Sequence, residues 1–89
     1  MSDFQDLVKL IHSIDDKVLL EDFLVALTTE KERQELPKRI DITRALLEGK
    51  SQHQVADELK VGISTVTRGA KELAQGNFKA LRAEQEVRI

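Results

Sequence analysis

The sequence predicts an all-α fold of six helices. Apolar residues recur at intervals of three and four along most of the chain, the spacing of a helix that buries one face. No stretch alternates apolar and polar residues for long enough to indicate a β-strand. Residues 29–32 and 51–54 have the Ser/Thr-x-x-Glu/Gln pattern that caps the start of a helix. These observations indicate a chain of short, capped helices.

The first two helices are predicted from apolar spacing. We expect an amphipathic helix over residues 2–13 and a second helix, with a broad apolar face, over residues 18–27. Between them, Ser13 and Asp15 can supply the oxygen atoms of a turn or a helix cap.

A longer third helix follows. Thr29 and Glu32 form the capping box at its start, and it should run to about Glu48, with Gly49 at its carboxyl end. Pro37 lies inside this helix. Because proline lacks an N–H and collides with the preceding turn, we expect a kink there.

Three shorter helices complete the prediction. Ser51 caps the fourth, which begins a helix-turn-helix at about residues 52–75. The fifth helix ends near Gly76, and Asn77 can cap a sixth that runs through Val87. Six helices leave little core for a chain of 89 residues, which we treat as one domain, residues 1–89. An interlocked oligomer would resolve this crowding.

Composition excludes several kinds of site. The chain has no cysteine, so it has neither disulfides nor thiolate metal ligands. His12 and His53 are far apart and have no acidic cluster beside them, so we expect no metal site. The acidic pairs at helix starts are typical of solvated charges, and we expect no enzyme activity. The acidic N-terminus and the lack of a membrane-length apolar run predict a soluble, cytoplasmic protein.

The distribution of charge favours a nucleic-acid partner. The net charge is −2, but residues 60–71 contain three basic residues and no acid. In the expected helix-turn-helix, Lys60 lies at a turn position where a left-handed backbone would cost about 1–2 kcal/mol. Gly62 caps the second helix, which begins at Ile63. Ala56 should lie at the closest crossing, and four further apolar residues should meet between the two helices: Val55, Leu59, Val61 and Val66.

Residues 27–74 resemble the Trp operon repressor family. The resemblance is carried by the segments "LTTEKERQEL", "RALLEG" and above all "GISTVTRG". It implies six helices per chain, a helix-turn-helix, and an intertwined homodimer in which the N-terminal helices of one subunit wrap the other. The partners that it implies are double-stranded operator DNA, a second copy of the chain, and a small-molecule amino acid.

The resemblance also implies a ligand site. L-Tryptophan, the corepressor, would lie between Arg39 and Arg68, with no other cofactor. Thr65 and Gly69 match the floor of the site, and Thr29 would line it from the partner chain, where preceding backbone carbonyls take the ligand's ammonium group. Glu72 stands where the family has a serine that contacts this ammonium group, and it could pair with the ammonium or alter ligand choice.

The DNA contacts that we expect centre on the second helix of the motif, since its start enters the major groove in such proteins. The residues expected near base edges or at the start of this helix are Gly62, Ile63, Ser64, Thr65 and Thr67. Those expected near phosphates are Gln52, His53, Lys60 and Lys71.

Several alternatives stay open from sequence alone. His53 could be a simple exposed side chain, and Arg39 could form a salt bridge on the helix surface. Arg44 and Lys38 could contact phosphates or pair with Glu48 and Glu35. The alternative function is a helical DNA-binding or protein-interaction module with no tryptophan response, or with a different effector.

Overall fold

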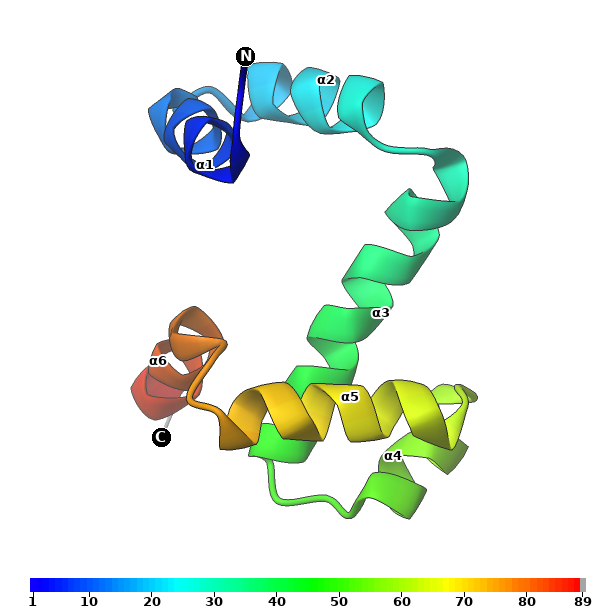
Figure 1. Ribbon diagram of the computed structural model, residues 1–89. Helices are drawn as coiled ribbons and strands as arrows, with labels where there is room; N and C mark the ends of the chain where they lie inside the picture. The colour runs from blue at the N-terminus through cyan, green and yellow to red at the C-terminus, as the bar shows by residue number, and fades with distance from the viewer. Residues whose placement is uncertain (89) are drawn as a thin grey trace. The chain divides into compact units, whose positions relative to one another are not determined.

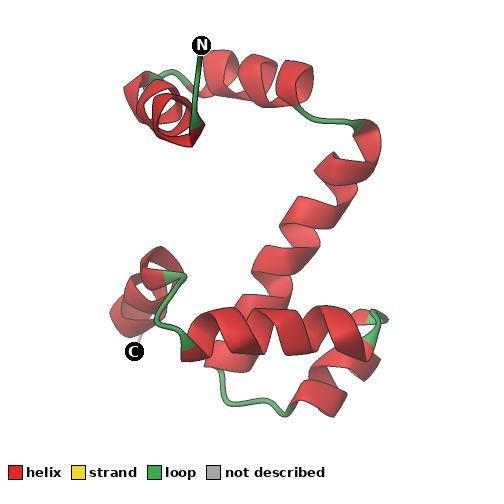
Figure 2. Cartoon of the chain, in the orientation of Figure 1, coloured by secondary structure: helices red, strands yellow, loops and turns green. Residues whose placement is uncertain are grey.

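The computed structural model describes residues 1–88, which form six helices and no strand (Figures 1 and 2). The predicted all-α fold is confirmed. The helices are α1 (Phe4–Ser13), α2 (Lys17–Leu27), α3 (Glu30–Leu47), α4 (Gln52–Leu59), α5 (Ile63–Ala74) and α6 (Lys79–Arg88). Contacts divide the chain into two units, Met1–Gln34 and Glu35–Ile89. Among the described residues, no helix is long and apolar enough to span a membrane.

A capping box that the sequence analysis missed fixes the start of α1. The carboxylate of Asp3 accepts a hydrogen bond from the backbone N–H of Asp6, and the Asp6 carboxylate accepts one from the N–H of Asp3. Aspartate replaces both residues of the usual Ser/Thr and Glu/Gln pattern, so a search for that pattern overlooks it. The helix therefore begins at Phe4 and not at residue 2.

The cap of α2 is Asp16, and neither Ser13 nor Asp15 caps this helix. The Asp16 carboxylate accepts hydrogen bonds from the first free N–H groups of α2, at 2.8 and 3.1 Å. Asp16 directly precedes the first helical residue, where a short side chain reaches these groups. The Ser13 hydroxyl instead donates to the carbonyl of Leu10, within α1.

The corner between α2 and α3 is held by side-chain hydrogen bonds. The predicted capping box is present: Thr29 N–H donates to Glu32 Oε1 at 2.9 Å, and Glu32 N–H donates to Thr29 Oγ1 at 3.1 Å. Arg33 Nη1 donates to the carbonyls of Val25 and Thr28, at 2.9 and 2.6 Å. Arg33 thus satisfies carbonyl groups that the end of α2 leaves without helical partners.

The apolar faces of α1 and α2 are largely uncovered within one chain. None of the described residues of these two helices is buried. Phe4, Val18 and Leu19 are 71%, 73% and 62% exposed, respectively. Single exposed apolar residues are ordinary in proteins. Two amphipathic helices without a buried residue, however, present apolar faces of the kind that contact another surface.

The third helix continues without interruption through Pro37 to Leu47. Gly49 follows with a φ of +92°, which fits the predicted glycine at the end of this helix. The kink expected at Pro37 stays a prediction.

The core of the second unit lies where α4 and α5 cross the second half of α3. Val55 and Val66 are fully buried, and Ile42 is 1% exposed. The expected contact between Val55 and Val66 is therefore confirmed. Leu46, Ala56 and Val61 pack around this cluster. Leu59, the last residue of α4, stays 36% exposed and is not part of this buried cluster.

The start of α6 also differs from the prediction. Phe78, not Asn77, is the cap residue: its carbonyl accepts hydrogen bonds from the N–H groups of Leu81 and Arg82, both at 3.1 Å. Phe78 has a φ of +61°, in the left-handed region. Asn77 lies one residue before the cap position, and its side-chain nitrogen donates to Glu72 Oε2 at 2.6 Å.

Side chains of α6 fasten it to α3 and α5. Arg44 pairs with Glu84 at 3.1 Å, so the alternative that paired Arg44 with Glu48 was wrong. Gln85 Nε2 donates to the carbonyl of Leu47, and Arg82 Nη2 donates to that of Leu73. The pairing of Arg44 with α6 depends on tertiary structure and has no local sequence signal.

Candidate functional site

The helix-turn-helix has a sharp turn between α4 and α5. Lys60 ends α4 with φ 55° and ψ 48°, so the strained left-handed backbone expected there is present. Its N–H donates to the carbonyl of Ala56 within α4, which closes this helix. Gly62 has extended backbone and caps α5, which begins at Ile63 as predicted. The turn therefore orients the start of α5 relative to α4.

The residues predicted to contact DNA lie on the surface of this motif. Gln52 is partly buried. The other predicted contact residues are exposed: His53, Lys60, Gly62, Ile63, Ser64, Thr65, Thr67 and Lys71. Gln52 and Thr67 are bonded to each other, because the Thr67 hydroxyl donates to Gln52 Oε1 at 2.7 Å. This bond joins the first turn of α4 to α5 and holds two of the predicted contact residues in place.

A hollow of about 880 Å³ lies beside α5, lined by α3, by α5 and by the turns before and after α5. We call it the effector hollow. Five of the six residues predicted to bind the ligand line it: Arg39, Thr65, Arg68, Gly69 and Glu72. Its volume falls in the range of small-molecule sites. Residues distant in sequence are thus brought to one place.

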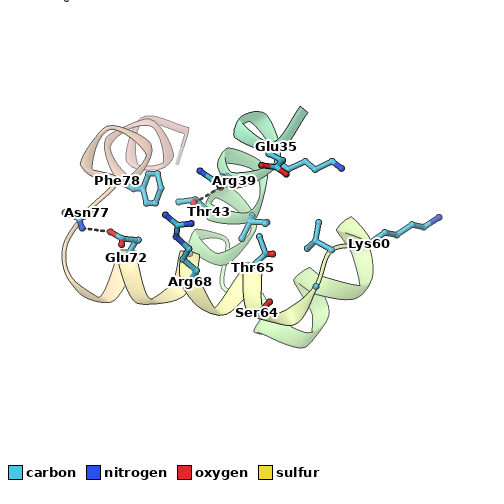
Figure 3. Close-up of a pocket in the computed structure, with 15 residues that line it drawn as sticks. Glu35, Arg39, Thr43, Lys60, Ser64, Thr65, Arg68, Glu72, Asn77 and Phe78 are labelled. Carbon is cyan, nitrogen blue, oxygen red and sulfur yellow. Dashed lines mark hydrogen bonds between the residues drawn. The ribbon is translucent and has the colours of Figure 1, made fainter. Parts of the chain in front are cut away.

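Arg39 and Arg68 extend into the effector hollow from α3 and α5 (Figure 3). Among the described residues, no acidic side chain forms an ion pair with either guanidinium group. The surface salt bridge considered for Arg39 is therefore absent from this part of the chain. Two unpaired guanidinium groups can stack on a planar ring and can bind a carboxylate.

The buried side of the hollow is formed where α3 and α5 pack against each other. Ile42 and Thr43 line it, and the buried Thr43 hydroxyl donates to the carbonyl of Arg39 at 2.9 Å. A Cβ added at Gly69 would lie 3.3 Å from Ile42 Cγ2, so glycine there lets α5 approach α3 closely. Gly69 therefore contributes to the site by allowing α5 to pack closely against α3.

Sequence reasoning missed several residues of this site. Asn77 and Phe78 line the effector hollow from the turn between α5 and α6. Neither belongs to a motif, and their position depends on how α6 folds back. Thr43 was also missed, although its spacing from Leu46 and Arg39 on α3 could have indicated the same face.

Thr29 belongs to the first unit, whereas the residues that line the hollow belong to the second. It lies at the start of α3 in the first unit, where its hydroxyl oxygen accepts the capping hydrogen bond. The neighbouring carbonyl of Thr28, one of those that the resemblance assigns to a ligand ammonium group, accepts a hydrogen bond from Arg33. The contribution of Thr29 from a partner chain stays a prediction.

Comparison with known proteins identifies the family. The model of the family described as Trp repressor protein matches residues 2–85. The chain is 44% identical over 72 residues to the Trp operon repressor homologs of Vibrio campbellii and Vibrio parahaemolyticus. The match covers 80% of this chain and 72% and 70% of those proteins. The chain belongs to the Trp repressor family.

A more distant relative agrees with this assignment to the Trp repressor family. The Trp operon repressor homolog of Vibrio cholerae is 38% identical over 73 residues, which is 81% of this chain and 71% of that protein. No solved structure matches the chain significantly. The family consists of DNA-binding regulators and not of enzymes, so the chain is a transcriptional repressor of this family.

Proposed function

We propose that the protein binds operator DNA as a homodimer and that L-tryptophan, bound between Arg39 and Arg68, raises its operator affinity. The observation that carries this proposal is the pair of unpaired guanidinium groups in the effector hollow, one of them on the helix that would read DNA. A planar ring with a carboxylate satisfies both the stacking surfaces and the charges of two arginines.

The position of the two arginines explains how a ligand can control DNA binding. Arg68 is on α5 and Arg39 is on α3, so a ring held between them fixes the angle between these helices. A dimer reads two half-sites only when its reading helices are about 34 Å apart, one turn of DNA. A ligand that binds more tightly to the arrangement with this spacing than to other arrangements increases the population of the DNA-binding form.

The homodimer is supported by the first unit. Its two amphipathic helices have no buried residue, whereas the second unit supplies its own core around Val55 and Val66. A second copy of the chain would cover the exposed apolar faces of α1 and α2. Thr29 would then reach the effector hollow of the partner.

Fluorescence anisotropy tests the proposal. The probe is a DNA duplex selected from a random library in the presence of L-tryptophan, and affinity is measured with and without the amino acid. We expect a gain of about 5- to 150-fold, the usual range of such coupling. Arg68→Leu should abolish this gain and leave weak, salt-sensitive binding, because phosphate contacts elsewhere persist.

Lys71→Ala is the matched control. Lys71 lies on the same helix but does not line the effector hollow. This variant should bind DNA more weakly and still gain affinity when L-tryptophan is added. If the wild type shows neither a heat of binding with L-tryptophan nor a change in DNA affinity, the corepressor is not tryptophan. A helical module that binds DNA without this effector, or with another one, would then replace the proposal.

A further inference from the structure

Phe78 lies at one end of the effector hollow, in the turn that joins α5 to α6. Its side chain is partly buried, and Figure 3 shows its ring at the same end of the hollow as the guanidinium groups of Arg39 and Arg68. Among the described residues that line the hollow, Phe78 alone is aromatic. It therefore supplies an aromatic surface to a hollow whose other lining side chains are mostly polar or charged.

The backbone of Phe78 has a conformation that a bulky residue rarely adopts. Its φ is +61°, in the left-handed region. Asparagine enters this region several times more often than other residues with a Cβ, yet the preceding Asn77 does not have a positive φ. Backbone strain of this kind concentrates at ligand sites, where the surrounding structure holds it in place. The strain thus falls on the residue whose ring lines the hollow, which favours a role in the site.

Hydrogen bonds on both sides of Phe78 hold this turn against α5. The N–H of Asn77 donates to the carbonyl of Glu72 at 3.0 Å, and the carbonyl of Phe78 accepts a bond of 3.1 Å from the N–H of Arg82. The Arg82 guanidinium group also donates to the carbonyl of Leu73, near the end of α5, at 2.6 Å. The turn is therefore fixed relative to the helix that carries one of the two arginines of the hollow.

The helix that follows Phe78 is also tied to α3, which carries the other arginine. Arg44 Nη2 on α3 donates to both carboxylate oxygens of Glu84 at 3.1 Å, and Gln85 Nε2 donates to the carbonyl of Leu47. Both contacts join the same face of α6 to α3. Because its position is set by both helices, the Phe78 ring can act as a fixed wall of the hollow.

A fixed aromatic wall suits an aromatic ligand. Two aromatic rings attract each other when the edge of one meets the face of the other, or when they stack with an offset. A ring held between Arg39 and Arg68 has its faces covered by guanidinium groups, so its edge is the part left to contact Phe78. A substituent that lengthens this edge would then collide with the wall.

We propose that Phe78 is a specificity-determining residue of the effector hollow: its ring contacts the edge of an aromatic ligand and limits the size of the ring system that fits. The ligand class is aromatic amino acids without a bulky substituent on the edge that meets Phe78. This inference rests on the proposed function, in which an aromatic amino acid binds between Arg39 and Arg68. It adds a further wall to that site, from the turn before α6.

Calorimetric titration of the full-length protein tests this size limit. The ligands are L-tryptophan and the benzyloxytryptophan isomers, which carry one bulky substituent at successive positions of the benzene ring. The wild type should prefer L-tryptophan. In Phe78→Ala, L-tryptophan should bind about threefold to tenfold more weakly, the factor that corresponds to the loss of an aromatic pair. At least one isomer should bind this variant more tightly than it binds the wild type, because the missing ring leaves room for its substituent.

Two further variants separate contact with the ligand from support of the fold. Phe78→Gly removes the same ring and relieves the left-handed backbone, so it should repeat the change in preference without loss of stability from strain. Val87→Ala, at an exposed residue of α6 outside the hollow, is the control and should leave all affinities unchanged. A merely structural role of Phe78 would weaken all ligands by the same factor. Circular dichroism checks that each variant is folded.

The outcomes distinguish this inference from the proposed function. If Phe78→Ala and Phe78→Gly bind all the ligands in the wild-type ratios, the inference is overturned and the tryptophan site stands. The same holds if the wild type binds every isomer as tightly as L-tryptophan. If the wild type binds none of these ligands, the proposed function and this inference fall together.

Discussion

Lys60 occupies the left-handed region because the chain must reverse within three residues between α4 and α5. Glycine adopts this conformation without the steric cost that a Cβ brings. Lys60→Gly should therefore stabilise the folded protein by about 0.5–1 kcal/mol, since relief of strain exceeds the added entropy of the unfolded chain. Urea denaturation measures this difference.

Lys60→Ala is the control for Lys60→Gly. Alanine removes the charge but keeps the Cβ, so its stability should stay close to that of the wild type. Equal stabilisation by both substitutions would show that charge, and not backbone strain, limits this turn.

A second residue-scale effect concerns the ion pair of Lys50 with Glu58, 2.7 Å apart. The hydrogen bond from Lys50 lowers the pKa of the Glu58 carboxyl below its usual value, and the bond to Glu58 raises the pKa of Lys50. The Glu58 contribution to stability is therefore present above the usual carboxyl pKa of about 4.3 and is lost as pH falls through the lowered value. The Lys50 contribution is present below the usual lysine pKa and is lost as pH rises through the raised value.

Carboxyl titration by NMR checks this pair. In Lys50→Gln, the pKa of Glu58 should rise toward its ordinary value, because both the charge and the principal hydrogen bond are lost. Both groups are exposed, so the change in global stability should be small. An unchanged Glu58 pKa in the variant would mean that the pair does not persist in solution.

At the scale of elements, helices whose caps follow the usual pattern could be predicted from sequence. Thr29 with Glu32 and Ser51 with Gln54 both form the expected cap bonds. In these cases the information is local, because the side chain and its backbone partner are three residues apart. The glycine at position 49 is also predictable, because its positive φ is a local property of the backbone at a helix end.

The errors arise where no local pattern sets the position of a cap or the partner of a side chain. Asn77 was expected to cap α6, but the carbonyl of Phe78, one residue later, takes the cap position. One alternative paired Arg44 with Glu48, but Glu84 on α6 pairs with it. The arginines of the site could be predicted from the resemblance to a family. The contribution of Asn77 and Phe78 to the hollow became visible only in the structure.

Two kinds of DNA contact are proposed for α5, and they can be told apart by experiment. Lys71→Ala removes a predicted phosphate contact and should weaken binding to all sequences, reducing the salt slope by about one unit. Ser64→Ala removes a predicted base contact and should change sequence preference while keeping the slope. Affinities for a set of operator variants at several salt concentrations measure both effects. Identical behaviour of the two variants would contradict this division of roles.

At the scale of the whole molecule, a single chain buries few apolar residues. The core of the second unit consists of four buried apolar residues, and α1 and α2 bury none. A chain of 89 residues buries a smaller fraction of its unfolded surface than a larger domain does. Covering the apolar faces of α1 and α2 with a second copy would supply the missing stabilisation without any new element.

We therefore expect an obligate dimer at micromolar concentration. Sedimentation equilibrium should give twice the 10.1 kDa mass of the chain. The thermal midpoint should rise with protein concentration, because association couples to folding by mass action. Val18→Ser, at a residue that is 73% exposed within one chain, should lower the midpoint and steepen its concentration dependence. Ile63→Ser, at a residue of α5 that is 43% exposed, is the control and should leave the concentration dependence unchanged. A folded monomer with a concentration-independent midpoint would show that the apolar faces of α1 and α2 are not the dimer interface.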